Sequence, residues 1–275
     1  MPVEVIVHPL ALVEPGAELG EGVRIGPFCH VGPEARIGDR TELGSHVTIM
    51  GATTLGPDCR VSPHAVLGAP PQNGKHKGGP STLSIGANCT IREFVTMHRG
   101  TDTSLAATTV GDNGNFLAYV HIAHDCTVGD NATFANGATL GGHCEIGDNV
   151  GIGGLTAVHQ FVRVGDGAFL GGCSAVISDV IPYGMASGNR ATLRGFNVVG
   201  LRRAGVGASE MAELRRFYGR LFDRSRTLAE NLEAVQGGRE SLPRHAQSIL
   251  DFLSARDKRN ITLPSVRGGT SAEEH

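Results

Sequence analysis

Aliphatic residues recur at every sixth position along most of this chain. The first run consists of Val7, Val13, Leu19, Ile25, Val31, Ile37, Leu43, Ile49, Leu55, Val61 and Leu67. The spacing resumes at Ile85, Ile91 and Met97, and a third run, which includes two phenylalanines, extends from Val110 to Val176. A helical period does not explain a spacing of six, so the ladder indicates a repeat architecture.

A small residue lies four positions after each aliphatic residue, and glycine often follows the aliphatic residue directly. The small residues of the first repeats are Ala11, Ala17, Val23, Cys29, Ala35, Thr41 and Val47. We interpret each hexad as one face of a prism of short parallel strands, with three hexads in each coil. The aliphatic and the small residue would point inward, and coils would stack about 4.8 Å apart.

Composition agrees with such a core. The chain has 275 residues with 40 Gly, no Trp and 5% aromatic residues, so the interior must be built from small and branched side chains. Five of the six cysteines, Cys29, Cys59, Cys89, Cys126 and Cys144, occupy the small inward position, and Cys173 lies one residue out of register. We expect buried fillers rather than disulfides, nucleophiles or zinc ligands.

The sequence carries no recognisable targeting segment. The N-terminal stretch MPVEVIVHPL lacks the basic and apolar regions of a signal peptide. No apolar run approaches the roughly 20 residues of a transmembrane helix. Cysteines spread through a long chain do not resemble a disulfide scaffold, so we expect a reducing, cytoplasmic setting.

Two insertions interrupt the ladder, at residues 69–84 and 100–109. Long loops without secondary structure are usually functional or disordered. The first insertion carries Gln72, Lys75, His76 and Lys77. Either it closes over an anionic ligand, or it is a solvated excursion, and the sequence leaves both interpretations open.

The hexad pattern stops after Val180, where we expect the segment IPYG to end the prism. Helical spacing then predicts helices over 209–225, with Ser209 as N-cap, and over 227–235 and 243–256. We therefore expect an all-β solenoid plus α. Residues 1–187 would form the repeat domain, residues 188–259 a small helical domain, and residues 260–275 a disordered tail.

Charge separates these two domains. Residues 1–189 contain 9 Lys and Arg against 17 Asp and Glu, whereas residues 190–275 contain 15 against 10. The basic C-terminal part suggests an anionic ligand or partner. We expect no nucleic-acid partner, because the chain shows neither an aromatic-rich basic platform nor a DNA-binding motif.

The segment HIAHDC, residues 121–126, concentrates polar chemistry in one hexad. His124 is the third residue when the repeat position Ile122 is counted as the first, which predicts an outward position, and Asp125 follows it. Steps of one coil lead from His124 to positions next to His143 and His159, which predicts three histidines along one edge. Three interpretations are open: surface histidines, a metal site, or acid–base chemistry on an acyl group or a sugar.

Several motifs, in this order, carry a family resemblance. They are PQ..K in the first insertion, TMHRGT (96–101), HIAHDCTVGD (121–130), ATLGGHCEIGD (138–148), GGLTAVHQF (153–161), GGCSAV (171–176), GN.AT (188–192) and GLRRAG (200–205). Together with the ladder they resemble the UDP-N-acetylglucosamine O-acyltransferases that open lipid A biosynthesis. The resemblance covers roughly residues 7–255.

The resemblance implies a left-handed parallel β-helix and a homotrimer with active sites between neighbouring subunits. It implies transfer of an (R)-3-hydroxyacyl group from acyl carrier protein to the 3-hydroxyl of UDP-N-acetylglucosamine, with no cofactor and no metal. His124 matches the general base, Asp125 the residue that orients it, and the Gly142 N–H a donor to the oxyanion. The implied substrate-binding residues are Gln72, Asn73, Lys75, His121, His143, His159, Gln160, Gly172, Arg190, Asn197 and Arg203.

The chain departs from the family pattern at Asn73, Arg190, Val199 and Ala204. These departures leave open whether the acceptor is a 3-hydroxyl or a 3-amino sugar, and how long the acyl chain is. Arginines of the C-terminal part could dock the acidic carrier protein or form a solvated helix face. Two other functions remain as alternatives: a zinc hydratase like the γ-class carbonic anhydrases, and a non-catalytic scaffold.

Overall fold

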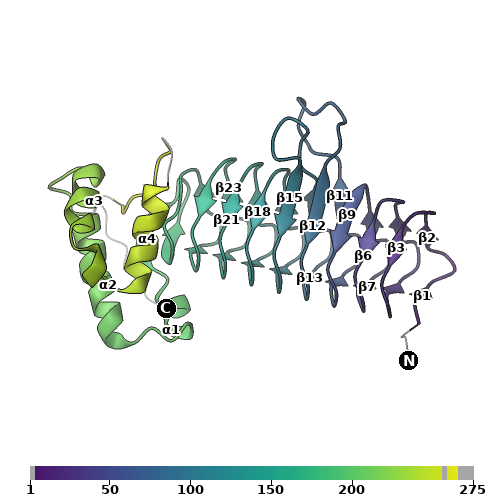
Figure 1. Ribbon diagram of the computed structural model, residues 1–275, viewed down its shortest axis with the longest axis horizontal. Helices are drawn as coiled ribbons and strands as arrows, with labels where there is room; N and C mark the ends of the chain where they lie inside the picture. Colours follow the sequence, from purple (N-terminus) through teal and green to yellow (C-terminus); the bar gives the residue numbers. More distant parts are fainter. Residues whose placement is uncertain (1–3, 256–258, 266–275) are drawn as a thin grey trace.

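The computed structural model describes residues 4–255 and 259–265 of the chain. It is an elongated prism of stacked coils with a group of helices at its C-terminal end (Figure 1). Each coil contributes one short strand to each of three sheets, A, B and C, and neighbouring strands within the stack are parallel except for the last pair of sheet A. The expected parallel β-helix is therefore confirmed.

The strands of the three sheets follow one another around the prism. Sheet A contains β1 (Ile6–Val7), β4 (Arg24–Ile25), β7 (Glu42–Leu43), β10 (Arg60–Val61), β13 (Thr90–Ile91), β16 (Asn115–Phe116), β19 (Thr133–Phe134), β22 (Gly151–Ile152), β25 (Phe169–Leu170), β27 (Gly184–Ser187) and β28 (Thr192–Phe196). Sheet B contains β2 (Leu12–Val13), β5 (His30–Val31), β8 (Thr48–Ile49), β11 (Val66–Ala69), β14 (Thr96–His98), β17 (His121–Ile122), β20 (Thr139–Leu140), β23 (Ala157–Val158) and β26 (Ala175–Val176). Sheet C contains β3 (Glu18–Leu19), β6 (Arg36–Ile37), β9 (Ala52–Leu55), β12 (Thr82–Ile85), β15 (Ala107–Val110), β18 (Thr127–Val128), β21 (Glu145–Ile146) and β24 (Arg163–Val164).

The hexad ladder supplies the core. From Ile25 onward its members are buried, as are the small residues four positions later, including Cys29, Cys59, Cys89, Cys126 and Cys144. Strands of successive coils pair three hexads apart, as in His121 with Thr139. The pairing distance along the chain is longer only where a loop is inserted between the two strands, as between Arg60 and Thr90. The five cysteines are thus buried fillers, as expected, and Cys173 is exposed.

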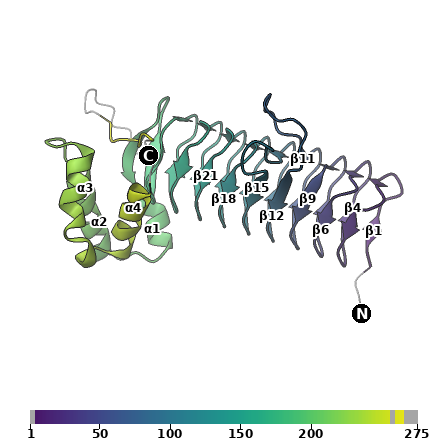
Figure 2. The same ribbon diagram turned by 45° about the horizontal axis from the view of Figure 1, so that its top comes forward.

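Both insertions project from one edge of the prism (Figure 2). The first loop, residues 70–81, joins β11 of sheet B to β12 of sheet C. The second loop, residues 99–106, joins β14 to β15, again from sheet B to sheet C. We call this edge the B–C corner, and the edge between sheets A and B the A–B corner. Because both loops leave the same corner in consecutive coils, they lie against each other.

The C-terminal part contains α1 (Val198–Arg203), α2 (Ala208–Leu221), α3 (Leu228–Gln236), the 3₁₀ turn η1 (Arg239–Ser241) and α4 (Arg244–Ser254). The three expected helices are present, but α1 is an addition to them. Ser209 is not the N-cap of α2. That position is Gly207, which makes no side-chain hydrogen bond. α3 instead begins with a full capping box between Thr227 and Glu230.

Two boundary predictions need correction. The segment IPYG does not end the stack, because β27 still pairs with β25 before β28 closes the sheet in the antiparallel sense. Residues 260–265 of the expected disordered tail are ordered. Ile261 forms a β-bridge with Asp179, and its side chain is only 7% exposed. Composition alone does not reveal this burial of an apolar side chain. Residues 266–275 lie outside the described residues. Among the described helices, none has the length and apolarity that a bilayer crossing requires.

Candidate active site

His124 and Asp125 lie at the B–C corner, between β17 and β18 and beneath the two loops. Asp125 has a φ of 58°, in the left-handed region, and this tight turn brings the side chains of two sequence neighbours together. We expected the His124 position to face outward. It points away from the prism core, but the loops cover it, and the residue is only 8% exposed.

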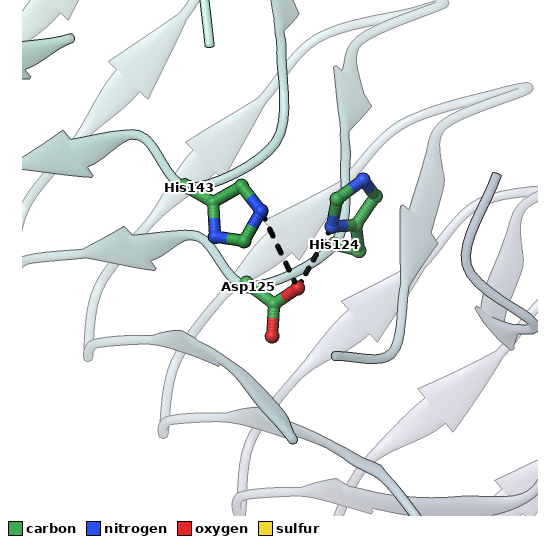
Figure 3. Close-up of side chains that lie close together, drawn as sticks. All are labelled: His124, Asp125 and His143. Carbon is green, nitrogen blue, oxygen red and sulfur yellow. Dashed lines mark hydrogen bonds and ion pairs between the residues drawn. The ribbon is translucent and has the colours of Figure 1, made fainter. Parts of the chain in front are cut away.

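The His124 imidazole and the Asp125 carboxylate form a hydrogen-bonded pair (Figure 3). His124 Nδ1 lies 2.8 Å from Asp125 Oδ2. Since an ionised carboxylate only accepts hydrogen bonds, we assign the proton of the neutral ring to Nδ1, which leaves a lone pair on Nε2. The amide Nδ2 of Asn73, on the first loop, lies 3.5 Å from Nε2. His124 is therefore set to accept a proton on the side that faces the first loop.

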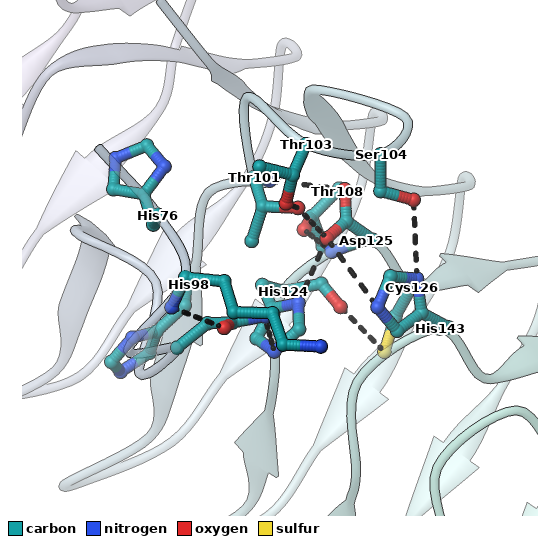
Figure 4. A network of polar contacts seen from close by, with 12 residues as sticks. His76, His98, Thr101, Thr103, Ser104, Thr108, His124, Asp125, Cys126 and His143 are labelled. Atoms are coloured by element: carbon teal, nitrogen blue, oxygen red, sulfur yellow. Dashed lines mark hydrogen bonds and ion pairs between the residues drawn. The ribbon is translucent and has the colours of Figure 1, made fainter. Parts of the chain in front are cut away.

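Thr101 of the second loop holds the Asp125 carboxylate (Figure 4). Its N–H donates to Oδ1 over 3.0 Å and its hydroxyl donates to Oδ2 over 2.7 Å. Burial raises the pKa of Asp125, but the hydrogen bonds from Thr101 and then from His124 outweigh burial and lower this pKa below its usual value. The carboxylate is thus kept ionised beside His124.

His143 lies at the same corner, one full coil after Asp125. Its ring meets the His124 ring edge-on at 5.1 Å between centroids and stacks on Phe161 at 4.4 Å. Its Nε2 is 3.9 Å from Asp125 Oδ2, and its Nδ1 is 3.3 Å from the hydroxyl of Ser104. Burial lowers the pKa of His143 and the nearby Asp125 only partly opposes this, so the ring is neutral at pH 7.

His124, Asp125 and His143 also form a group that could hold a metal ion. One donor atom from each lies within 4.8 Å of the other two. Two imidazoles and a carboxylate suit zinc. Asp125 Oδ2, however, already accepts hydrogen bonds from Thr101 and His124, and a metal there would have to displace one of them. The existing bonds are those that an acid–base pair requires.

Gly142 supports the His124 ring from the following coil. A Cβ atom at Gly142 would lie 2.5 Å from His124 Cε1 and 2.8 Å from Nε2. No other residue type leaves this room for the ring. Within the described residues, the Gly142 N–H donates no hydrogen bond, while its carbonyl accepts one from Phe161. A free backbone donor therefore lies beside the proton acceptor.

His121 and His98 complete the polar cluster on the sheet B side. Their rings meet edge-on at 5.2 Å. His98 Nδ1 donates to the carbonyl of Pro70 over 2.8 Å, and His121 Nδ1 lies 2.8 Å from the Thr96 hydroxyl. Burial, followed by the charges of His98 and His124, lowers the pKa of His121 to about 4, and burial also lowers that of His98. Both rings are neutral hydrogen-bonding groups near pH 7.

Two regions of the chain match protein-family models: residues 179–262 match "Udp N-acetylglucosamine O-acyltransferase; Domain 2" and residues 107–142 match "Bacterial transferase hexapeptide (six repeats)". An acyl-[acyl-carrier-protein]–UDP-N-acetylglucosamine O-acyltransferase of Mesorhizobium japonicum is 66% identical over 269 residues, which are 98% of this chain and 96% of that protein. The enzyme of the same name from Brucella ovis is 49% identical over 272 residues, 99% of this chain and 98% of its own. The chain belongs to the UDP-N-acetylglucosamine O-acyltransferase family.

Solved structures of family members share the whole architecture. The UDP-N-acetylglucosamine acyltransferase from Campylobacter jejuni superposes with a TM-score of 0.86 at 38% identity, over 95% of this chain and 100% of its own. The enzyme from Francisella novicida gives a TM-score of 0.89 at 32% identity, over 98% of this chain and 100% of its own. The family fold therefore includes both the β-helix and the C-terminal helices.

Of the remaining residues that the family resemblance nominated, Asn73 alone makes a hydrogen-bonding contact with His124 within the described residues. His159 lies at the same B–C corner as His124 and His143, as expected, but it does not continue their stack. It is exposed with its Nδ1 3.1 Å from the Gln160 carbonyl, and Phe161 stacks on His143 instead. The reason is register: one full coil leads from Asp125 to His143, whereas the same step reaches His159 from Gly141. Gln160 is exposed one coil beyond Gly142.

Four nominated residues lie nearer the C-terminal end. Gly172 is exposed at the A–B corner, and Arg190 and Arg203 are exposed beyond the last coils. The Asn197 amide caps α1, since its Oδ1 accepts the Gly200 N–H and its Nδ2 donates to the Gly167 carbonyl. On the first loop, Gln72 and Lys75 are exposed, and Asn73 is the nominated residue that contacts His124.

Three residues of the cluster escaped the sequence reasoning: His98, Thr101 and Ser104. His98 and Thr101 stand in the motif TMHRGT, which carries the family resemblance without indicating a role for either residue. Their positions depend on how the loops return to the prism, and the hexad ladder is interrupted there. Burial of His98 and Thr101 beside an insertion would have marked them as site residues. That burial becomes evident only once the structure of the B–C corner is known.

Proposed function

We propose that this chain transfers an acyl group from acyl carrier protein to the 3-hydroxyl of UDP-N-acetylglucosamine, the first step of lipid A biosynthesis. The observation that carries the proposal is the chain of hydrogen bonds from Thr101 through Asp125 to His124, which directs the lone pair of Nε2 toward the first loop. The names of the relatives state this donor and this acceptor for those enzymes. A carrier-protein donor also agrees with a cytoplasmic location.

In the proposed mechanism His124 acts as general base. Nε2 takes the proton of the sugar hydroxyl as its oxygen attacks the carbonyl carbon of the thioester. A C–O bond forms, the carbonyl π electrons move to oxygen, and the N–H of Gly142 donates to this oxyanion. When the tetrahedral intermediate collapses, the C–S bond breaks, and the thiolate of the carrier takes the proton from the His124 imidazolium. Asp125 stabilises that imidazolium and holds its tautomer.

The remaining nominated residues would bind the two substrates. Gln72, Asn73 and Lys75 would contact the sugar nucleotide from the first loop, together with His121 and His143 beside the base. His159, Gln160, Arg190, Asn197 and Arg203 would contact it from the C-terminal coils, and Gly172 would lie at the end of the acyl groove. This division requires residues from different corners of the prism at one site.

A homotrimer would bring those corners together. His124 lies at the B–C corner and Gly172 at the A–B corner of the same chain, so a site that contains both needs two chains. Sheet B lies between these corners, and its outward residues include no Lys, Arg, Asp or Glu: Leu12, His30, Thr48, Val66, Thr96, His121, Thr139, Ala157 and Ala175. Sheets A and C carry outward charges, such as Arg60 and Glu145. An uncharged sheet face suits burial against further copies of the chain.

The A–B corner continues this apolar face. Phe28, His46, His64, Phe94 and Tyr119 form a column of rings with successive centroids 4.7–4.9 Å apart. Leu155 extends the column and is 71% exposed. In the proposed trimer, sheet B and this column face neighbouring subunits around the threefold axis.

The C-terminal helices offer a surface for the carrier protein. α2 buries Met211, Leu214, Phe217 and Leu221. Its arginines Arg215, Arg216 and Arg220 are exposed on the other side, as are Arg202 and Arg203 of α1. We propose that this basic surface attracts acidic acyl carrier protein, which would raise the association rate more than the affinity.

One assay tests the function. The protein is incubated with UDP-N-acetylglucosamine and acyl carrier proteins that bear chains of several lengths, and the product is weighed by mass spectrometry. We expect one O-acylated product, and His124→Ala should lower turnover by about 10²–10⁴-fold. Near-normal turnover in that variant would refute the role of His124. Product from a 3-amino sugar nucleotide alone would refute the hydroxyl acceptor, and activity lost to chelators would favour a zinc hydratase.

A further inference from the structure

Asp102 connects the second loop to the first. Its Oδ2 accepts the N–H of Gly79 over 2.9 Å, and both carboxylate oxygens lie 3.2–3.3 Å from the N–H of Lys77. These backbone hydrogen bonds lower the pKa of Asp102 below its usual value, with Gly79 the largest contribution. An ionised carboxylate therefore binds two backbone donors of the first loop.

His76 adds a side-chain contact to this connection. Its Nδ1 lies 3.1 Å from Asp102 Oδ1 and 3.3 Å from the Asp102 N–H. With the proton on Nδ1 the ring donates to the carboxylate, and with the proton on Nε2 it accepts from the backbone, so either neutral tautomer binds residue 102. The two side chains are 11% and 18% exposed, which shields the contact from solvent.

The first loop is shaped for this contact. A Cβ atom at Gly79 would lie 2.6 Å from Asp102 Cβ and 2.8 Å from Oδ2, so glycine is needed for the close approach. Before His76, the loop makes a turn in which the Asn73 carbonyl accepts the His76 N–H and Asn73 Oδ1 accepts the Lys75 N–H. The attachment at residues 76–79 therefore extends through this turn to the Asn73 amide that contacts His124.

Adjacent residues of the second loop thus have two different tasks. Thr101 holds the Asp125 carboxylate, which belongs to the catalytic pair, whereas Asp102 holds the first loop. The second loop therefore contacts both the catalytic pair and the first loop, which carries Gln72, Asn73 and Lys75. A change at Asp102 should release the first loop and leave the bonds of Thr101 to Asp125 intact.

We propose that Asp102 is a positioning residue that fixes the first loop over His124 and thereby sets the affinity for the sugar nucleotide. The proposal rests on the proposed function, in which the first loop contacts UDP-N-acetylglucosamine. A preordered loop spares the substrate the cost of ordering it on binding. Loss of Asp102 should therefore weaken binding of the nucleotide without slowing the chemical step.

The test compares Asp102→Ala with Asp112→Ala in the full-length protein. Asp112 also accepts a backbone N–H, from Ala87 over 2.7 Å, but at the corner between sheets C and A, away from the site. We expect Asp102→Ala to raise KM for UDP-N-acetylglucosamine about tenfold, equivalent to about 1.4 kcal/mol, with kcat within about twofold. Calorimetric Kd for the same nucleotide, without donor, should rise equally, and Asp112→Ala should change neither constant. Asp102→Asn, which keeps one acceptor oxygen, should give an intermediate KM.

Three results would overturn the proposal. An unchanged KM and Kd in Asp102→Ala would show that the first loop does not need this contact. A lower kcat at constant KM would show that residue 102 acts through Thr101 on the base instead. Trypsin cleavage after Lys75 and Lys77 provides a measure that needs no substrate: it should accelerate in Asp102→Ala and not in Asp112→Ala. If the parent protein binds no UDP-N-acetylglucosamine, the proposed function fails, while equal cleavage rates would still refute the role of Asp102.

Discussion

Gly142 leaves no room for any atom between its Cα and the imidazole of His124. A Cβ there would lie 2.5 Å from Cε1, and the contacted atoms belong to a ring that is also held by Asp125. Gly142→Ala should therefore push the ring from its place, break the 2.8 Å bond to Asp125, or both. Since a displacement of about 1 Å can cost a hundredfold in rate, we expect kcat/KM to fall at least about 100-fold.

A glycine with free space is the control for this substitution. Gly219 lies inside α2, and a Cβ there would meet nothing within 4 Å. Gly219→Ala should leave kcat/KM unchanged and raise the thermal midpoint slightly, because alanine favours the helix by about 1 kcal/mol over glycine. Full activity in Gly142→Ala would show that the ring can move without loss and that its observed position is not required.

Thr101 is the second test of the catalytic pair. Thr101→Val keeps the shape and the backbone N–H but removes the hydroxyl that donates 2.7 Å to Asp125 Oδ2. A hydrogen bond to a charged group contributes about 1.5–3 kcal/mol, so we expect kcat to fall about tenfold. Removing this donor should raise the pKa of Asp125, which the bond now lowers. The acid limb of the kcat–pH profile should therefore move to higher pH.

Thr53→Val separates this effect from a general loss of stability. Thr53 is also fully buried, and it lies in an earlier coil than the site. Its hydroxyl donates a 2.7 Å hydrogen bond to the Met50 carbonyl. Its replacement should lower the thermal midpoint but leave the pH profile of kcat in place. A profile that shifts equally in both variants would mean that the Thr101 hydroxyl has no specific effect on Asp125.

The hexad ladder made most of the β-helix predictable. Each sixth residue must be apolar because it fills the interior, and this constraint repeats in every coil, so the pattern survives single exceptions. α1 escaped prediction because six residues are too few for a helical period to show. The prediction of Ser209 as N-cap is wrong because it rests on a local residue preference, whereas α2 begins after Gly207 without any side-chain hydrogen bond.

The site was predictable only where the ladder sets the register. Step counting from His124 comes within one residue of both His143 and His159. It did not reveal that Phe161 rather than His159 stacks on His143, because a difference of one or two residues at a corner changes the direction of the side chain. Thr101 and Ser104 reach Asp125 and His143 from a loop whose path no repeat governs. Contacts of this kind depend on two distant segments at once, which a single sequence does not reveal.

The proposed trimer makes a prediction at Leu155. This residue is 71% exposed at the A–B corner, where it continues the column of rings from Phe28 to Tyr119. Leu155→Arg should place a charge in the subunit contact and shift the protein from trimer to monomer in sedimentation velocity, with loss of activity. Phe169→Arg, at a 37% exposed position on the outward face of sheet A and outside the proposed contact, tests whether any such charge has this effect. A trimeric Leu155→Arg variant would place the contact elsewhere.

Arg163 and Asp179 join the last coils to α4, and they allow a stability prediction. Arg163 Nε donates 2.8 Å to Asp179 Oδ2, and the guanidinium lies 4.3 Å from the ring centroid of Phe252 in α4. The side chains are 12% and 1% exposed, so Asp179→Ala would leave a buried cation without its partner. We expect the free energy of unfolding to fall by about 3–5 kcal/mol in urea titrations, and amides of α4 to exchange faster. Asp58→Ala, which breaks the exposed pair with Arg40, should have little effect. Equal losses of unfolding free energy in the two variants would show that burial does not make the Arg163–Asp179 pair more important for stability than an exposed pair.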